Sequence, residues 1–64
     1  MRQNIIEGDC LKSRFTNDLA NFCRKYGSQF GNFKGIKDGK YIVESGYRTF
    51  ELSKDEFERD WIID

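Results

Sequence analysis

Few residues of this 64-residue chain carry side chains that enzymes use in catalysis. The sequence contains no histidine and only two cysteines, Cys10 and Cys23. Without histidine, the chain lacks the usual general base at neutral pH and the commonest nitrogen ligand of zinc. Two cysteines alone cannot complete a four-ligand structural zinc site, and a cysteine nucleophile would have no imidazole partner. We therefore expect no metal, no cofactor and no enzymatic activity.

The two cysteines fall in a segment that the sequence predicts to be one helix. Cys23 follows Phe22 and is close to the apolar stripe of that helix, which favours a packed thiol over a reactive one. Cys10 would lie in the first helical turn, where backbone N–H groups favour a thiolate. A spacing of thirteen residues puts the two side chains on roughly opposite sides of a helix. We expect no disulfide between them.

Carboxylates three or four residues apart occur near the carboxyl end, as in general acid–base pairs. The pairs are Asp55 with Glu58 and Glu56 with Asp60. A 64-residue domain offers little room for a desolvated pocket between such groups. We interpret them as helix capping and a solvated helix face, with Arg59 as a counter-charge.

Composition and charge restrict the class of protein. Eleven basic residues balance eleven acidic ones, so no overall field attracts nucleic acid or an acidic membrane surface. Residues 1–64 are too few for more than a single small domain. Met1 to Gly8 lacks the apolar run of a secretory signal, and no stretch is long enough to span a bilayer. We expect a cytoplasmic protein that binds no membrane.

The segment from Phe33 to Leu52 is typical of three short strands joined by two tight turns. Asp38-Gly39 is a strong two-residue hairpin signal and Ser45-Gly46 a weaker one. With these loops, Lys34 faces Val43 in the first hairpin, and Tyr41 faces Phe50 in the second.

Side-chain alternation then assigns these residues to two faces of the sheet. The first face would form the core, and it collects Ile36, Tyr41, Val43, Phe50 and Leu52, with Lys34 and Arg48 among them. The second face collects Phe33, Gly35, Ile42, Glu44, Tyr47, Thr49 and Glu51, with Lys37 and Lys40 by the turn.

Helical signals lie on both sides of this sheet. Between Asp9, the expected N-cap, and Gly27, placed to end the helix, apolar residues recur every three or four positions. They are Leu11, Phe15, Leu19, Phe22 and Tyr26. After the sheet, Ser53 and Glu56 form a capping box that predicts a short helix from Lys54 to about Ile62.

The predicted fold is therefore α+β, with a long N-terminal helix packed on a three-stranded antiparallel meander, followed by a short C-terminal helix. Ile5 and Ile6 are compatible with a further strand at the sheet edge or with a packed tail. The position of the last helix decides the state of the second sheet face. Trp61 either joins the main core and leaves that face exposed, or it covers the face together with Phe57.

With no catalytic apparatus, we expect a small non-enzymatic binding module that docks on a larger protein. Such a module would suit an inhibitor or adaptor of the kind encoded by phages and plasmids. The candidate contacts are Phe33, Ile42, Tyr47 and Thr49, with Lys37 and Lys40 at the rim. The structural alternative is that the last helix or Ile5 and Ile6 cover this patch.

Two further partners remain open. Aromatic and basic residues interleaved on the sheet would suit single-stranded nucleic acid, although Glu44 and Glu51 lie among them. An edge strand, either Phe33 to Ile36 or Tyr47 to Leu52, could pair with a second copy to form a homodimer.

One segment has a likeness to a known family. The run from Asp38 to Trp61, with Asp-Gly-Lys-Tyr-Ile-Val-Glu and then Gly-Tyr-Arg-Thr-Phe-Glu-Leu-Ser-Lys-Asp-Glu-Phe-Glu-Arg-Asp-Trp, covers about a third of the chain. It resembles the late strand-turn-strand-helix segment of bacteriocin-processing cysteine peptidases. The catalytic cysteine and histidine regions of that family have no counterpart in this chain. The resemblance therefore implies no activity and no site residue.

Overall fold

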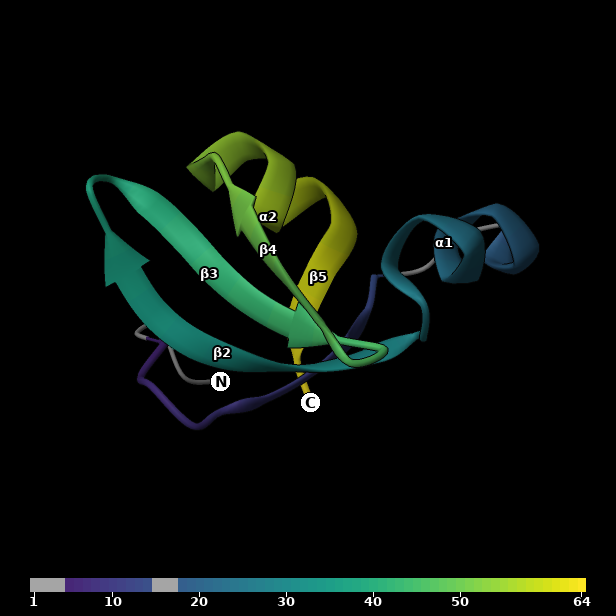
Figure 1. The fold of residues 1–64 in the computed structure, drawn as a ribbon, viewed down its shortest axis with the longest axis horizontal. Helices are drawn as coiled ribbons and strands as arrows, with labels where there is room; N and C mark the ends of the chain where they lie inside the picture. Colours follow the sequence, from purple (N-terminus) through teal and green to yellow (C-terminus); the bar gives the residue numbers. More distant parts are fainter. Residues whose placement is uncertain (1–4, 15–17) are drawn as a thin grey trace.

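The computed structural model describes residues 5–14 and 18–64. Within these ranges, five strands form one antiparallel sheet in the order β4-β3-β2-β1-β5. The elements are β1 (Cys10–Ser13), α1 (Leu19–Tyr26), β2 (Phe30–Lys37), β3 (Lys40–Ser45), β4 (Arg48–Leu52), α2 (Lys54–Asp60) and β5 (Trp61–Ile63). Figure 1 shows β2 and β3 as long curved strands, with α2 beside β4 and β5 and with α1 beyond one end of the sheet.

The predicted long N-terminal helix on a three-stranded meander is wrong. Cys10–Ser13 is β1, which pairs with β2 on one side and β5 on the other, and the helix begins only at Leu19. Leu11 alone is buried among Cys10, Leu11 and Lys12, which is the alternation of a strand. Pairing on both edges overrides a local pattern that suited a helix equally well. The prediction for Phe15 lies outside the described residues.

The start of α1 also differs from the prediction. Asp18, not Asp9, is the N-cap, and its side chain accepts a hydrogen bond from the backbone N–H of Asn21 at 3.2 Å. Asp9 instead accepts a hydrogen bond from the backbone N–H of Ile6 at 2.9 Å, in the turn before β1. The predicted stop is confirmed, because Gly27 ends the helix in the left-handed conformation at φ 85°.

The capping box of α2 is confirmed, but the helix is shorter than predicted. The Ser53 hydroxyl accepts from the Glu56 N–H at 3.1 Å, and the Glu56 carboxylate accepts from the Ser53 N–H at 3.1 Å. These hydrogen bonds, above all the one from the Ser53 backbone, lower the pKa of Glu56. The helix ends at Asp60, and Trp61–Ile63 continues as β5 along β1.

The first hairpin follows the predicted register only as far as a bulge. Gly35 pairs with Ile42 as predicted, but the register then shifts, so that Phe33 rather than Lys34 lies opposite Val43. Gly35 has a φ of 111°, which glycine adopts readily. The one-residue shift turns Phe33 from the second face to the core face, where its side chain is 2% exposed.

The second hairpin turns one residue later than predicted. Ser45 pairs with Arg48, so the loop is Gly46-Tyr47 rather than Ser45-Gly46. Both loop residues have positive φ, 57° and 67°, as in a type I′ turn. The register therefore moves by two positions, and Tyr41 lies opposite Leu52. A shift of two leaves the side chains of β4 on their predicted faces, whereas Tyr47 leaves the sheet face and joins the loop.

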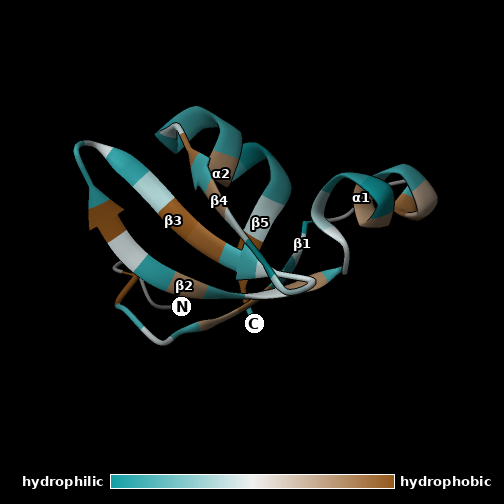
Figure 2. Cartoon of the chain, viewed as in Figure 1, coloured by the Kyte–Doolittle hydropathy of each residue, from teal (hydrophilic) through white to brown (hydrophobic). Residues whose placement is uncertain are grey.

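The described core is mostly aromatic and lies on one side of the curved sheet. Its buried residues are Leu11, Tyr26, Phe33, Val43, Leu52, Phe57 and Trp61. The Tyr26 ring lies 5.1 Å from the Trp61 ring and 5.0 Å from the Phe50 ring, between centroids. Figure 2 shows apolar and polar residues in alternation along β2 and β3. Because Phe57 and Trp61 join the main core, α2 leaves the second face of the sheet uncovered.

The amino-terminal isoleucines form no strand. Residues 5–9 lie in a turn before β1, Ile5 packs against the edge of the core, and Ile6 is 57% exposed. In the described part of the chain, neither helix has the length and apolar character needed to cross a membrane.

Candidate functional site

The predicted contact residues separate into four places. Phe33 is buried in the core, so its assignment to the second face is wrong. Ile42 is half-buried and Thr49 exposed on the outer face of β3 and β4, and Tyr47 is fully exposed at the tip of their hairpin. Lys37 and Lys40 pair across the other turn, at the opposite end of β3. The two lysines therefore do not border Tyr47.

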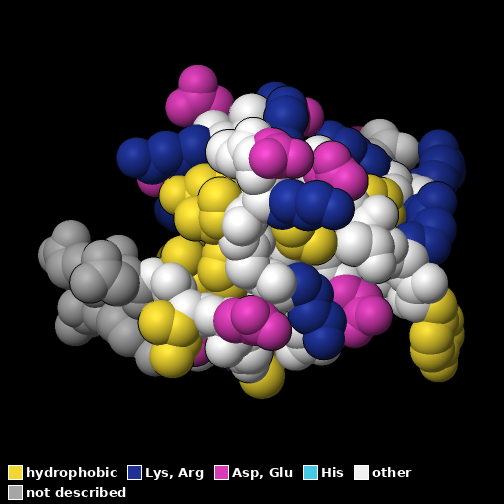
Figure 3. All heavy atoms as spheres, turned by 60° about the vertical axis from the view of Figure 1, so that its left-hand side comes forward, with side chains coloured by type: hydrophobic (Ala, Val, Ile, Leu, Met, Phe, Trp, Pro, Cys, Tyr) yellow, Lys and Arg dark blue, Asp and Glu magenta, His cyan; other side chains and the backbone are white. Residues whose placement is uncertain are grey.

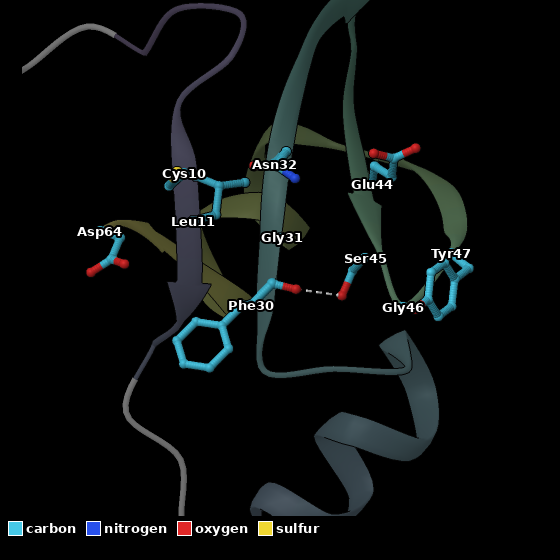
Figure 4. Close-up of a pocket in the computed structure, with 10 residues that line it drawn as sticks. All are labelled: Cys10, Leu11, Phe30, Gly31, Asn32, Glu44, Ser45, Gly46, Tyr47 and Asp64. Atoms are coloured by element: carbon cyan, nitrogen blue, oxygen red, sulfur yellow. Dashed lines mark hydrogen bonds between the residues drawn. The ribbon is translucent and has the colours of Figure 1, made fainter.

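A cavity on this outer face brings together residues that the sequence left apart. Its volume is about 490 Å³, and it is open to solvent. It is lined by Cys10, Leu11, Phe30, Gly31, Asn32, Glu44, Ser45, Gly46, Tyr47 and Asp64, which Figure 4 shows as sticks. We call this cavity the outer groove.

One wall of the outer groove is a polar row that crosses the strands. Asn32 of β2 lies between its register partners Cys10 of β1 and Glu44 of β3. Asp64 extends the row beyond β1, since its backbone N–H donates to the Cys10 carbonyl at 2.9 Å. Figure 4 shows Asp64 and Glu44 at the two ends of this row.

The floor of the outer groove is backbone, because the next row of side chains points into the core. Leu11 and Ser45 are buried, and Gly31 lies between them in the sheet. A Cβ on Gly31 would lie 2.9 Å from the Glu44 carbonyl oxygen and 3.3 Å from Cη2 of Trp61. The Ser45 hydroxyl donates to the Phe30 carbonyl at 2.8 Å, which satisfies a buried polar group. The packing of Trp61 beneath Gly31 thus leaves a flat floor.

Two exposed aromatic rings border the other side. Phe30 is 55% exposed and Tyr47 is 105% exposed. Figure 4 shows the Phe30 ring on the side of β1 and the Tyr47 ring beyond β3.

The tip that carries Tyr47 is held firmly against α1. A Cβ on Gly46 would lie 2.7 Å from Cα of Gly27, so the two glycines allow a close backbone approach. Arg48 also donates from Nη2 to the carbonyl of Lys25 at 3.0 Å. Tyr47 therefore extends into solvent from a turn that is held in place by the backbone contact with Gly27 and by the Arg48 hydrogen bond.

The charge that lines the outer groove is negative. Glu44 and Asp64 carry carboxylates, and none of the lining residues is basic. Lys34 Nζ lies 3.6 Å from Glu44 Oε1, and Lys12 Nζ lies 3.9 Å from Asp64 Oδ1. All four side chains are about half exposed. Such exposed ion pairs contribute about 0–1 kcal/mol to stability, so neither carboxylate is held strongly by its lysine. Figure 3 shows acidic and basic side chains mixed over one face of the molecule.

The described residues include no candidate metal cluster. No group of three or more cysteine, aspartate or glutamate side chains among them is arranged to hold a metal ion. Cys10 lies in β1 rather than in a helical turn, so the backbone N–H groups expected to favour its thiolate are absent from its position. Both described cysteines are free.

Sequence reasoning missed Phe30, Asn32 and Asp64 as parts of one site. Phe30 precedes the expected first strand, and the bulge reverses which residues of β2 point outward. Asp64 comes next to Cys10 only through the pairing of β5 with β1.

Comparisons with protein-family models, with curated proteins and with solved structures find no match for this chain.

Proposed function

We propose that this chain is a small non-enzymatic binding module that docks on a larger protein through the outer groove. The observation that carries the proposal is Tyr47, a bulky residue at φ 67° whose ring is fully exposed. A left-handed conformation costs a non-glycine residue about 1–2 kcal/mol. Because the exposed ring buries little surface in return, its presence is better explained by an external contact.

The surroundings of Tyr47 support a protein partner. Phe30 supplies a second exposed ring, and Ile42 and Thr49 extend the surface along β3 and β4. Exposed aromatic residues next to polar ones are typical of protein contacts, in which aromatic residues are enriched. Within the proposal the module acts as an inhibitor or adaptor in the cytoplasm. Lys37 and Lys40 lie at the β2–β3 turn, here called the far turn, and contact only a partner that extends that far.

The test is affinity capture of a partner protein from a cell lysate by the purified chain and by two groove variants, Tyr47→Asn and Phe30→Ser. We expect both to lose the captured protein by at least about tenfold, as for central aromatic contacts. Asparagine tolerates the left-handed conformation, so Tyr47→Asn should unfold at the same or a higher temperature. Ile36→Ser is the matched control, because Ile36 is 58% exposed on β2 near the far turn.

Either of two results would remove the docking proposal. Capture that survives both groove variants would show that the outer groove is not the contact. Capture that disappears with nuclease and falls steeply with salt would favour the alternative, single-stranded nucleic acid stacked on the exposed rings. The carboxylates of Glu44 and Asp64 in the groove oppose that alternative.

A further inference from the structure

The outer groove crosses the strands, and its two walls differ in chemistry. The polar row ends in the carboxylates of Glu44 and Asp64, whereas the other side carries the rings of Phe30 and Tyr47. Between them the floor is backbone at Gly31 and its neighbours. An extended segment places alternate side chains on opposite sides. A segment lying along the groove would therefore present one set to the acids and the other set to the rings.

The charge of the polar wall selects among such segments. An acidic segment would be repelled by Glu44 and Asp64, and a neutral one would shield their exposed lysine pairs from water without adding an opposite charge. Lys12 and Lys34 do not prevent a basic segment from binding, because their ion pairs are exposed and weak. A guanidinium is less strongly hydrated than a lysine ammonium and binds a carboxylate through two hydrogen bonds, so it can displace either lysine.

The spacing of the two carboxylates fits two arginines rather than one. Glu44 lies on β3, and Asp64 directly follows the last residue of β5. The strand order β3-β2-β1-β5 therefore puts three strand spacings, about 14 Å, between the two carboxylates. Four residues of an extended chain cover nearly the same length, about 13–14 Å. We infer that the outer groove binds an extended segment of a protein partner that carries arginines four positions apart, with apolar residues facing Phe30 and Tyr47. This inference rests on the proposed docking function.

The test is a nuclear magnetic resonance titration of the isotope-labelled chain with two blocked pentapeptides. The first is Arg-Val-Ser-Val-Arg, and the second replaces both arginines by citrulline, which has nearly the same shape but no charge. We expect saturable shifts at the amides of Asn32, Glu44 and Tyr47 with the first peptide. Its affinity should exceed that of the citrulline peptide by about tenfold and should fall with salt. Equal affinities, or no saturable shift with the arginine peptide, would overturn the inference.

Charge variants locate the binding. Glu44→Gln and Asp64→Asn should each weaken the arginine peptide several-fold. Glu51→Gln is the control, since Glu51 is exposed on β4 and does not line the groove. An equal effect of all three variants would indicate a general field rather than a groove site and would also overturn the inference.

The two proposals fail in different ways. If Tyr47→Asn abolishes protein capture but the two pentapeptides bind alike, docking stands and the arginine segment is wrong. If the arginine peptide is preferred but capture survives Tyr47→Asn and Phe30→Ser, the docking contact is wrong although the groove binds arginine.

Discussion

Asp60 connects α1 to the end of α2 through its side chain. Its Oδ2 accepts a hydrogen bond from the Tyr26 hydroxyl at 2.5 Å, and its Oδ1 accepts from Arg59 Nε at 3.0 Å. Burial alone would raise the pKa of this carboxyl, but the hydrogen bonds from Arg59 and Tyr26 outweigh burial and hold it below its ordinary value. Burial, together with the bond to Asp60, raises the pKa of Tyr26. The pair therefore favours the folded state with Asp60 ionised and Tyr26 protonated.

Removing the Tyr26 hydroxyl should weaken the fold in a pH-dependent way. We expect Tyr26→Phe to lower the free energy of unfolding at pH 7 by about 1–2 kcal/mol. Because the pKa of Asp60 is lower in the folded state, its contribution is present above about pH 4 and is lost as the pH falls through the folded value. The difference between wild type and variant should therefore shrink in acid. Urea unfolding at pH 7 and in strong acid checks this, with Tyr41→Phe as the control, and a difference independent of pH would contradict it.

At the scale of elements, β2 shows how one strand serves both the core and the outer groove. Its core face carries Phe33, which is buried, and its outer face carries Phe30 and Asn32 in the groove wall. Gly31 lies between Phe30 and Asn32 along the strand, and Trp61 packs against it on the core face. The bulge near Gly35 allows Phe33 to point inward while the hairpin turn keeps its predicted register.

A methyl group at Gly31 should therefore disturb the core. Its Cβ would meet the Glu44 carbonyl at 2.9 Å, and backbone in a central strand cannot move freely. We expect Gly31→Ala to lower the free energy of unfolding by about 1–3 kcal/mol, as overpacking does. Gly39→Ala is the comparison, because that Cβ would meet nothing within 4 Å and only its φ of 79° opposes the change. Denaturant unfolding with a smaller loss at Gly31 than at Gly39 would contradict the packing argument.

At the scale of the whole molecule, the strand order determines which backbone groups stay unpaired. β2 lies between β1 and β3, but β1 pairs only with the first residues of β2, Phe30–Asn32, so in the described structure Lys34 to Ile36 has β3 as its one strand neighbour. Among the described strands, β4 and β5 are the outer ones. In an antiparallel ladder, hydrogen-bonded residue pairs alternate with non-hydrogen-bonded ones. Counted from the hydrogen-bonded pair Ser45–Arg48, Glu51 falls in a non-hydrogen-bonded pair with Ile42, so its N–H points away from β3.

A homodimer through β4 remains a prediction with a direct test. Pairing of two copies would raise the average mass above 7.6 kDa as concentration increases in sedimentation equilibrium. Glu51→Pro removes the outward N–H and should abolish that rise without breaking the ladder to β3. Glu51→Gln keeps the N–H and serves as the control. A mass of one chain at all concentrations would exclude this dimer.

Local signals in the sequence determined several features of the fold. The Asp38-Gly39 turn, the left-handed stop at Gly27 and the capping box of Ser53 and Glu56 each depend on residues a few positions apart. The assignment of Val43 and Leu52 to the core also held, because it depends on the alternation of a strand. The absence of histidine, which limits the available chemistry, is likewise a property of the sequence alone.

Tertiary structure decided the features that depend on distant partners. Cys10–Ser13 becomes a strand because β2 and β5, far along the chain, satisfy its backbone on both sides. The bulge that buries Phe33 and the one-residue move of the second loop depend on how whole strands pack against Trp61 and α1. The outer groove follows from these pairings, since Asp64, Asn32 and Glu44 form a row only once β5, β1, β2 and β3 are aligned. Such non-local pairings leave no signature in any short window of sequence, because their free energy arises only when the strands meet.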